Sequence, residues 1–131
     1  MKTPKLGGHP KFYEILDKQA QLHSNKNHDY SGGQRDKPLS NFSRMSKLMQ
    51  LYPDMDWSTP TSTALFQLIR QLDAALILYS RQLNSKVGEP VTSRLNDIAV
   101  LANLAQILYE EEISRHKDPL APYLNNDKEN K

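Results

Sequence analysis

The chemistry open to this sequence depends first on three acidic residues, Asp73, Glu89 and Asp97. Asp73 stands one helical turn before Ile77, and Asp97 stands one turn before Leu101, so each acid is predicted on the apolar side of a helix. A carboxylate placed there needs a cation, a metal ion or several hydrogen-bond donors. Because Mg²⁺ binds carboxylate and phosphate oxygens, the three acids are candidate metal ligands and catalytic groups for the hydrolysis of a phosphoanhydride.

Each acid also has a structural interpretation. Arg70 precedes Asp73 by one turn, so the two residues could form an ion pair that only satisfies the buried charge. Glu89 precedes a predicted helix, where a carboxylate complements the positive end of the helix dipole. Two acids on two predicted core helices, Asp73 and Asp97, are harder to explain as structural than one, so both interpretations stand at this point.

A second candidate region is the segment 25–38, where turn-forming and charged residues predict a long loop. Tyr30 could stack on a base, and Gly32–Gly33 would let the backbone approach a ligand closely. Four potential phosphate donors lie in the same segment: Lys26, His28, Arg35 and Lys37. A charged loop is otherwise simply solvated, and no Ser/His/Asp or Cys/His arrangement accompanies His28. We expect residues 26–37 to form a mobile cover that becomes ordered when a nucleotide binds.

Helical periodicity predicts the elements that position these residues. Apolar residues recur at helical spacing over about 10–24, 38–51, 60–83 and 90–114, and no alternating strand pattern is present. The fold is therefore predicted to be all-α, a small bundle of about four helices with a long loop between the first two. Residues 1–9 are predicted to be a flexible N-terminus, 10–114 the helical domain and 115–131 a polar tail, in which 119–124 could dock as a strap.

Composition limits the classes of protein to consider. With 131 residues, 37% hydrophobic residues and 24% charged residues, the chain suits one globular domain. The net charge of +2 comes from 17 basic and 15 acidic residues spread along the chain, so a nucleic-acid partner is unlikely. There is no cysteine, signal-like segment or apolar run long enough for a membrane span, which predicts a soluble cytoplasmic protein without membrane partners. The run 74–79 is apolar all round and predicts a homo-oligomer, most simply a dimer.

Four short motifs stand out along the chain: Lys26-Asn27-His28-Asp29-Tyr30-Ser31-Gly32, Asn41-Phe42, Arg70-Gln71-Leu72-Asp73, and Glu89 with Asp97-Ile98-Ala99-Val100-Leu101-Ala102. Together they resemble the phage-associated nucleotide modification associated domain 1 family. The resemblance covers residues 10–110. It implies an all-helical fold distantly similar to all-α NTP pyrophosphohydrolases, which hold Mg²⁺ on helix carboxylates. It also implies a phage origin, and hence the host cytoplasm.

The loop chemistry and the resemblance together give a set of candidate residues. The candidate substrate-binding residues are Lys26, His28, Asp29, Tyr30, Asn41 and Arg70, and the candidate catalytic and metal-binding residues are Asp73, Glu89 and Asp97. The chain departs from the family pattern at three places, with Ser93 for an acid, Ala74 for a lysine and Ser31 before Gly32. We expect a phage-type nucleotide-binding protein, for which the resemblance implies Mg²⁺-dependent hydrolysis of a nucleoside triphosphate and the three departures put that hydrolysis in doubt. The alternatives are a non-catalytic protein that sequesters nucleotides or nucleotide-like signals, and a structural or protein-interaction bundle.

Overall fold

The computed structural model describes residues 7–117 and confirms an all-α fold. Its four helices are α1 (Pro10–Ser31), α2 (Ser40–Gln50), α3 (Pro60–Ser80) and α4 (Val91–Lys117). Among the described residues there is no β-strand. The N-terminal residues 1–6 and residues 118–131, which include most of the predicted tail and the predicted strap at 119–124, lie outside the described part of the chain.

The predicted end of the first helix is wrong. Residues 25–31 continue α1 without a break, so the connection to α2 shortens from the predicted 25–38 to residues 32–39. The helix ends at Gly32, which has a left-handed backbone (φ 71°) and donates its N–H to the carbonyl of His28. Asn25, Asn27 and Asp29 are poor helix formers, but contacts with other elements override that local preference. The predicted mobile cover is therefore helical over 26–31.

The other helix boundaries lie close to the prediction. The Thr59 hydroxyl caps α3 by accepting the backbone N–H of Ser62 at 3.0 Å, and Pro60 occupies the first turn. The α4 helix runs through Lys117, three residues beyond the predicted end at 114. None of the helices in the described part of the chain is long and apolar enough to cross a membrane.

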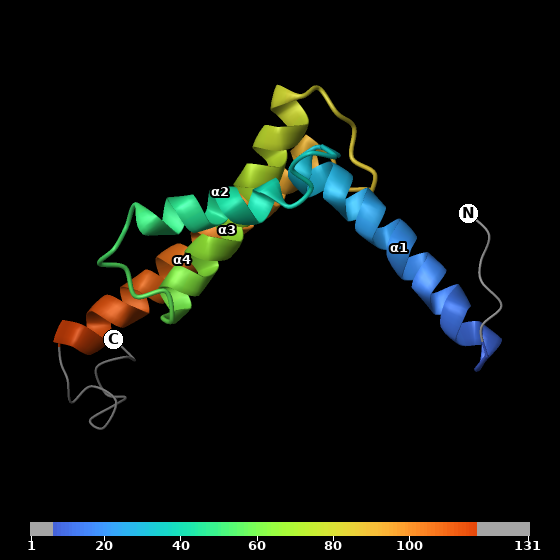
Figure 1. Cartoon of the computed structure of the whole chain (residues 1–131). Helices are drawn as coiled ribbons and strands as arrows, with labels where there is room; N and C mark the ends of the chain where they lie inside the picture. Colours follow the sequence, from blue (N-terminus) through green and yellow to red (C-terminus); the bar gives the residue numbers. More distant parts are fainter. Residues whose placement is uncertain (1–6, 118–131) are drawn as a thin grey trace.

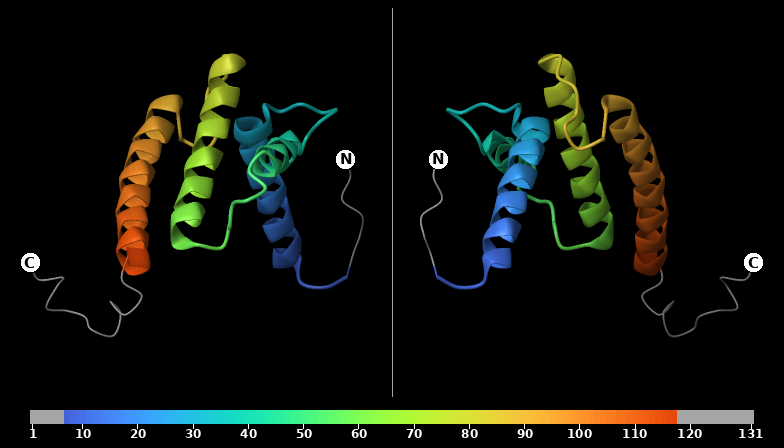
Figure 2. Two further views of the ribbon diagram at one scale, coloured as in Figure 1. Left: turned by 90° about the vertical axis from the view of Figure 1, so that its left-hand side faces the viewer. Right: turned by 90° about the vertical axis from the view of Figure 1, so that its right-hand side faces the viewer.

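The helices are arranged around an α3–α4 hairpin (Figure 1). These two helices run antiparallel and lie side by side along most of their length (Figure 2). The shorter α2 crosses α3 on the side away from α4, and α1 reaches this body only with its C-terminal end. The rest of α1 projects outward, so the molecule has the outline of an open V in Figure 1.

The core is small and the fully buried side chains are mostly polar. The buried apolar residues are Met45, Ala74, Ala75, Leu78 and Ala105, and the buried polar residues are Asp29, Ser31, Ser62 and Arg94. Large apolar side chains remain exposed on every helix, among them Phe12, Leu16, Phe42, Leu76, Tyr79, Leu104 and Ile107. A single copy of this chain therefore buries little of the apolar surface that normally drives folding.

Candidate functional site

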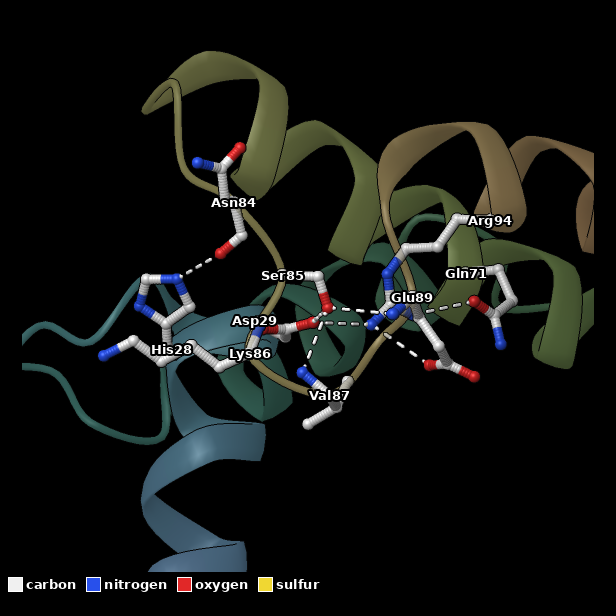
Figure 3. A network of polar contacts seen from close by, with 9 residues as sticks. All are labelled: His28, Asp29, Gln71, Asn84, Ser85, Lys86, Val87, Glu89 and Arg94. Atoms are coloured by element: carbon white, nitrogen blue, oxygen red, sulfur yellow. Dashed lines mark hydrogen bonds and ion pairs between the residues drawn. The ribbon is translucent and has the colours of Figure 1, made fainter.

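A buried polar network forms where the end of α1 meets the α3–α4 connection (Figure 3). Asp29 lies in the last turn of α1 with none of its side chain exposed. One carboxylate oxygen accepts the hydroxyl of Ser85 at 2.5 Å and faces the Arg94 guanidinium at 3.2 Å, while the other accepts the Lys86 backbone N–H at 2.8 Å. Asp29 therefore joins α1 to the α3–α4 connection and to α4.

Arg94 supplies the positive charge of this network. Its side chain is completely buried, and it donates to Gln71 of α3 at 2.9 Å and pairs with Glu89 at 3.3 Å. The Nε–H has no hydrogen-bond partner in the described structure. A buried ion pair stabilises a fold little over an apolar pair, but losing one member leaves an uncompensated charge. The Asp29–Arg94 pair thus specifies how α1 docks on the hairpin.

The aromatic ring of Tyr30 connects this network to the surface of the protein. The Arg94 guanidinium carbon lies 5.1 Å from the centre of the ring, and that of Arg70 lies 6.0 Å from it. Both distances allow cation–π attraction, which is stronger for the desolvated Arg94. The buried cation therefore orients the Tyr30 ring, while the exposed Arg70 is free to move.

The alternative interpretation of Asp73 named the wrong partner, because Asp73 binds Arg44 of α2 and not Arg70. The Arg44 guanidinium makes two bonds to this carboxylate, from Nε at 2.7 Å and from Nη2 at 2.9 Å. The hydrogen bond to Asp73 raises the pKa of Arg44 further above its usual value, against the opposing effect of partial burial. Arg44 also donates to the Tyr30 carbonyl at 2.9 Å, so this pair ties α2 to both α3 and α1.

Two adjoining cavities surround Tyr30, and together we call them the Tyr30 cleft. They have volumes of about 240 and 230 Å³ and share four lining residues, Tyr30, Asn41, Phe42 and Arg70. The first is completed by Met45, Phe66 and Asp73, and the second by His23, Lys26, Asn27 and Leu39. Aromatic walls with a few cations and amides are typical of small-molecule sites, and the combined size is within the usual range of about 300–1,000 Å³.

The structure brings together four of the six predicted substrate-binding residues. Lys26, Tyr30, Asn41 and Arg70 all line the second cavity, although they come from three different helices. The other two predicted residues lie elsewhere. His28 contacts the Asn84 carbonyl through Nε2 at 2.8 Å, and Asp29 is buried in the polar network. Both of these side chains hold the α3–α4 connection and do not line the cleft.

The three predicted metal-binding acids do not converge. Among residues 7–117 no group of three His, Cys, Asp or Glu side chains is placed to hold a metal ion. Both oxygens of Asp73 are engaged by Arg44, and Glu89 pairs with Arg94. The expectation that Asp97 lies on a buried face is wrong, since its side chain is exposed. In this arrangement the three acids do not fit a shared Mg²⁺ site.

A third and larger cavity, of about 680 Å³, lies along the start of α2. It contains three cationic side chains, Lys37, Arg44 and Lys47, and the hydroxyls of Ser40 and Ser43. Arg44 is already neutralised by Asp73, so the two lysines carry the unpaired positive charge there. This cavity lacks an aromatic wall, so it suits an anion better than a planar ring.

Sequence reasoning missed Arg44 and Arg94, the two cations that organise the site. A signal existed for Arg94, because it shares one helix face with the buried Ala105 and the half-buried Ile98 and Leu101. A cation on that apolar face predicts a buried partner. No comparable signal marks Arg44, which lies 29 residues from Asp73 in the sequence.

Comparisons with protein-family models, with curated proteins and with solved structures found no match to this chain.

Proposed function

We propose that this protein binds a nucleoside phosphate in the Tyr30 cleft. The observation that carries the proposal is the meeting of Lys26, Tyr30, Asn41 and Arg70 in one cavity. A nucleotide requires a planar apolar surface for its base and positive charge for its phosphates, and this cavity offers both.

The aromatic residues of the cleft define where the base would bind. Tyr30 and Phe42 line both cavities, and Phe66 closes the deeper part beside Met45. Stacking of a base on such rings is worth about 1–3 kcal/mol and tolerates different bases. Asn41 lines both cavities, and because its Oδ1 accepts the Ser31 hydroxyl at 2.7 Å, its Nδ2 is the group that could donate to a base edge.

The phosphates would bind at the α1 side of the cleft. Lys26 and Arg70 are exposed cations, and among the described residues neither forms an ion pair. Among the described residues, Arg70 donates a hydrogen bond to the Gln67 side chain at 3.3 Å and lies over the Tyr30 ring, so it can turn toward an anion without breaking a described salt bridge. Both residues are therefore free to donate charge-assisted hydrogen bonds to phosphate oxygens.

Binding without hydrolysis is the form of the proposal that the carboxylates favour. Asp73 is the acid that lines the cleft, and its charge is matched by Arg44. A carboxylate engaged in this way is a poor metal ligand and a poor general base. A nucleotide-binding or nucleotide-sequestering protein, working as a homo-oligomer in the host cytoplasm, is the function we propose.

The test is a thermal-shift screen of nucleoside triphosphates, with and without Mg²⁺, beside tripolyphosphate as an anion that has no base. A bound ligand raises the melting temperature, and the stabilisation grows with the logarithm of the ligand concentration relative to its Kd. We expect stabilisation by at least one nucleotide, less by tripolyphosphate, and no dependence on Mg²⁺. Lack of stabilisation by every nucleotide would refute the proposal, and release of pyrophosphate with Mg²⁺ would replace it with hydrolysis.

Two pairs of variants then locate the site. Lys26→Ala and Arg70→Gln should each weaken nucleotide binding about tenfold, the effect of losing one phosphate contact of about 1.4 kcal/mol. Lys18→Ala and Arg35→Gln are the matched controls, because both residues are exposed cations that line neither cavity of the cleft. If the control variants weaken binding as much as the others, the nucleotide binds outside the Tyr30 cleft.

A further inference from the structure

The N-terminal part of α1, residues 10–24, projects away from α2, α3 and α4 (Figure 1), and we call it the α1 arm. None of its side chains is buried, and only Tyr13 is even partly covered. An isolated helix of this length is marginal in water, because its nucleation is costly and little packing repays it. The arm therefore needs a surface that residues 7–117 of a single copy do not provide (Figure 1).

The uncovered side of the arm is apolar. Phe12, Ile15, Leu16 and Leu22 form a continuous stripe, and each is between 44% and 57% exposed. Phe12 and Tyr30 are separated by five full turns of α1, so they point in the same direction. At the C-terminal end of α1, the face that carries Tyr30 contacts Arg70 of α3. The same face of α1 is exposed along the arm.

A second stripe of exposed apolar residues lies on α3. Leu72, Leu76 and Tyr79 share one face of the helix and are 39%, 55% and 76% exposed. The opposite side of α3 is covered, since Ala74, Ala75 and Leu78 are buried. The apolar run 74–79 in the middle of α3 is therefore covered on one side only.

We infer that two copies of this chain form a symmetric dimer in which the arm of each copy packs on the α3 stripe of the other. A twofold axis makes this contact twice, so both uncovered stripes of both copies are buried. Each half-exposed side chain of this size has on the order of 100 Å² of accessible surface that a partner can bury. The seven residues of the two stripes then supply close to the roughly 800 Å² per partner of a standard interface.

The charges of the arm favour a protein surface over a lipid surface. Lys11 and Lys18 lie at the edge of the stripe, one turn before Ile15 and Leu22, and Glu14 and Asp17 lie on the far side, so the arm carries two cations and two anions. Helices that lie on anionic membranes carry an excess of Lys and Arg on their polar face. A second copy of the chain needs no such excess, and it offers the matching stripe on α3.

Sedimentation of the full chain at tens of micromolar tests the inference. We expect a species of twice the 15.0 kDa chain mass for the wild type, and a single chain for Leu16→Asp or Phe12→Asp. Gln21→Asp adds the same charge on the opposite, exposed face of the arm and should leave the dimer intact. A monomeric wild type, or a Leu16→Asp protein that dimerises as the wild type does, would overturn the inference.

Mixing two variants tests which surfaces meet. Leu16→Asp damages the arm and Leu76→Asp damages the α3 stripe, so each protein alone should be monomeric. In a mixed pair, the intact arm of the second variant meets the intact α3 stripe of the first, and we expect partial recovery of the dimer. Absence of recovery, with both variants folded by circular dichroism, would refute the arm-to-α3 contact. Flotation of the wild type, but not Leu16→Asp, with anionic phospholipid vesicles would assign the arm to a membrane instead.

Discussion

The two ends of α1 differ in how they contact the rest of the protein. At the C-terminal end, Asp29 and Ser31 are completely buried and bonded to three other elements. At the N-terminal end, Phe12, Ile15 and Leu16 are exposed and have no partner in α2, α3 or α4. One helix thus carries a polar anchor that fixes its direction and an apolar stripe that is left uncovered by the other described helices. In the dimer that we propose, burial of this stripe by a second copy would add the stability that the arm lacks.

The largest effect should come from breaking the polar anchor. Asp29→Ala leaves Arg94 buried with only the half-exposed Glu89 as a counter-charge, and it removes the acceptor of two further donors. Loss of one member of a buried pair costs about 3–5 kcal/mol, most of the stability of a small domain. Urea denaturation should therefore show a much lower midpoint or no folded baseline.

Asp97→Asn is the matched control for this change. Asp97 is an exposed acid on α4 that lines neither cavity of the Tyr30 cleft, so its loss should change stability by less than about 0.5 kcal/mol and leave nucleotide binding unaltered. A severe defect from Asp97→Asn, or a mild one from Asp29→Ala, would reverse the contrast between the two acids.

The sequence predicted the elements of this fold better than the connections between them. Helical periodicity placed α3 and α4 well, because long apolar periods and a Thr59–Pro60 cap are local signals. It failed at residues 25–31, where local propensity favours a loop and the bonds of Asp29 to distant residues hold a helix.

The candidate site was predicted in part, for a similar reason. Lys26, Tyr30, Asn41 and Arg70 were chosen from residue type and motif, and they line one cavity. The partners of the acids were not predictable, because an ion pair such as Arg44–Asp73 depends on how two helices cross. Residue type indicates that a buried carboxylate needs a cation, but spacing within one helix does not identify which cation.

An intermediate effect should come from protein concentration. If the arm is stabilised only by a second copy, the melting temperature of the wild type should rise with concentration, because each tenfold increase adds about 1.4 kcal/mol per mole of dimer to the apparent free energy of unfolding. The Leu16→Asp protein should show no such dependence, since it has no dimer to dissociate. Calorimetry over a hundredfold range of concentration measures the unfolding midpoint of both proteins. The same concentration dependence in wild type and Leu16→Asp would show that the arm does not stabilise the protein through dimerisation.

The smallest effect should come from the second carboxylate on Arg94. Glu89 pairs with the same guanidinium as Asp29, but 44% of its side chain is exposed, so water and salt screen its charge. Glu89→Gln should therefore cost no more than about 1 kcal/mol, and this cost should disappear in about 1 M salt, where the screening length falls to about 3 Å. The effect of Asp29→Ala should persist at the same salt concentration, because no solvent reaches that pair. Urea denaturation of both variants at low and high salt compares the two acids directly. If the two losses respond to salt in the same way, burial is not what distinguishes them, and the anchoring role belongs to the guanidinium of Arg94 and its bond to Gln71.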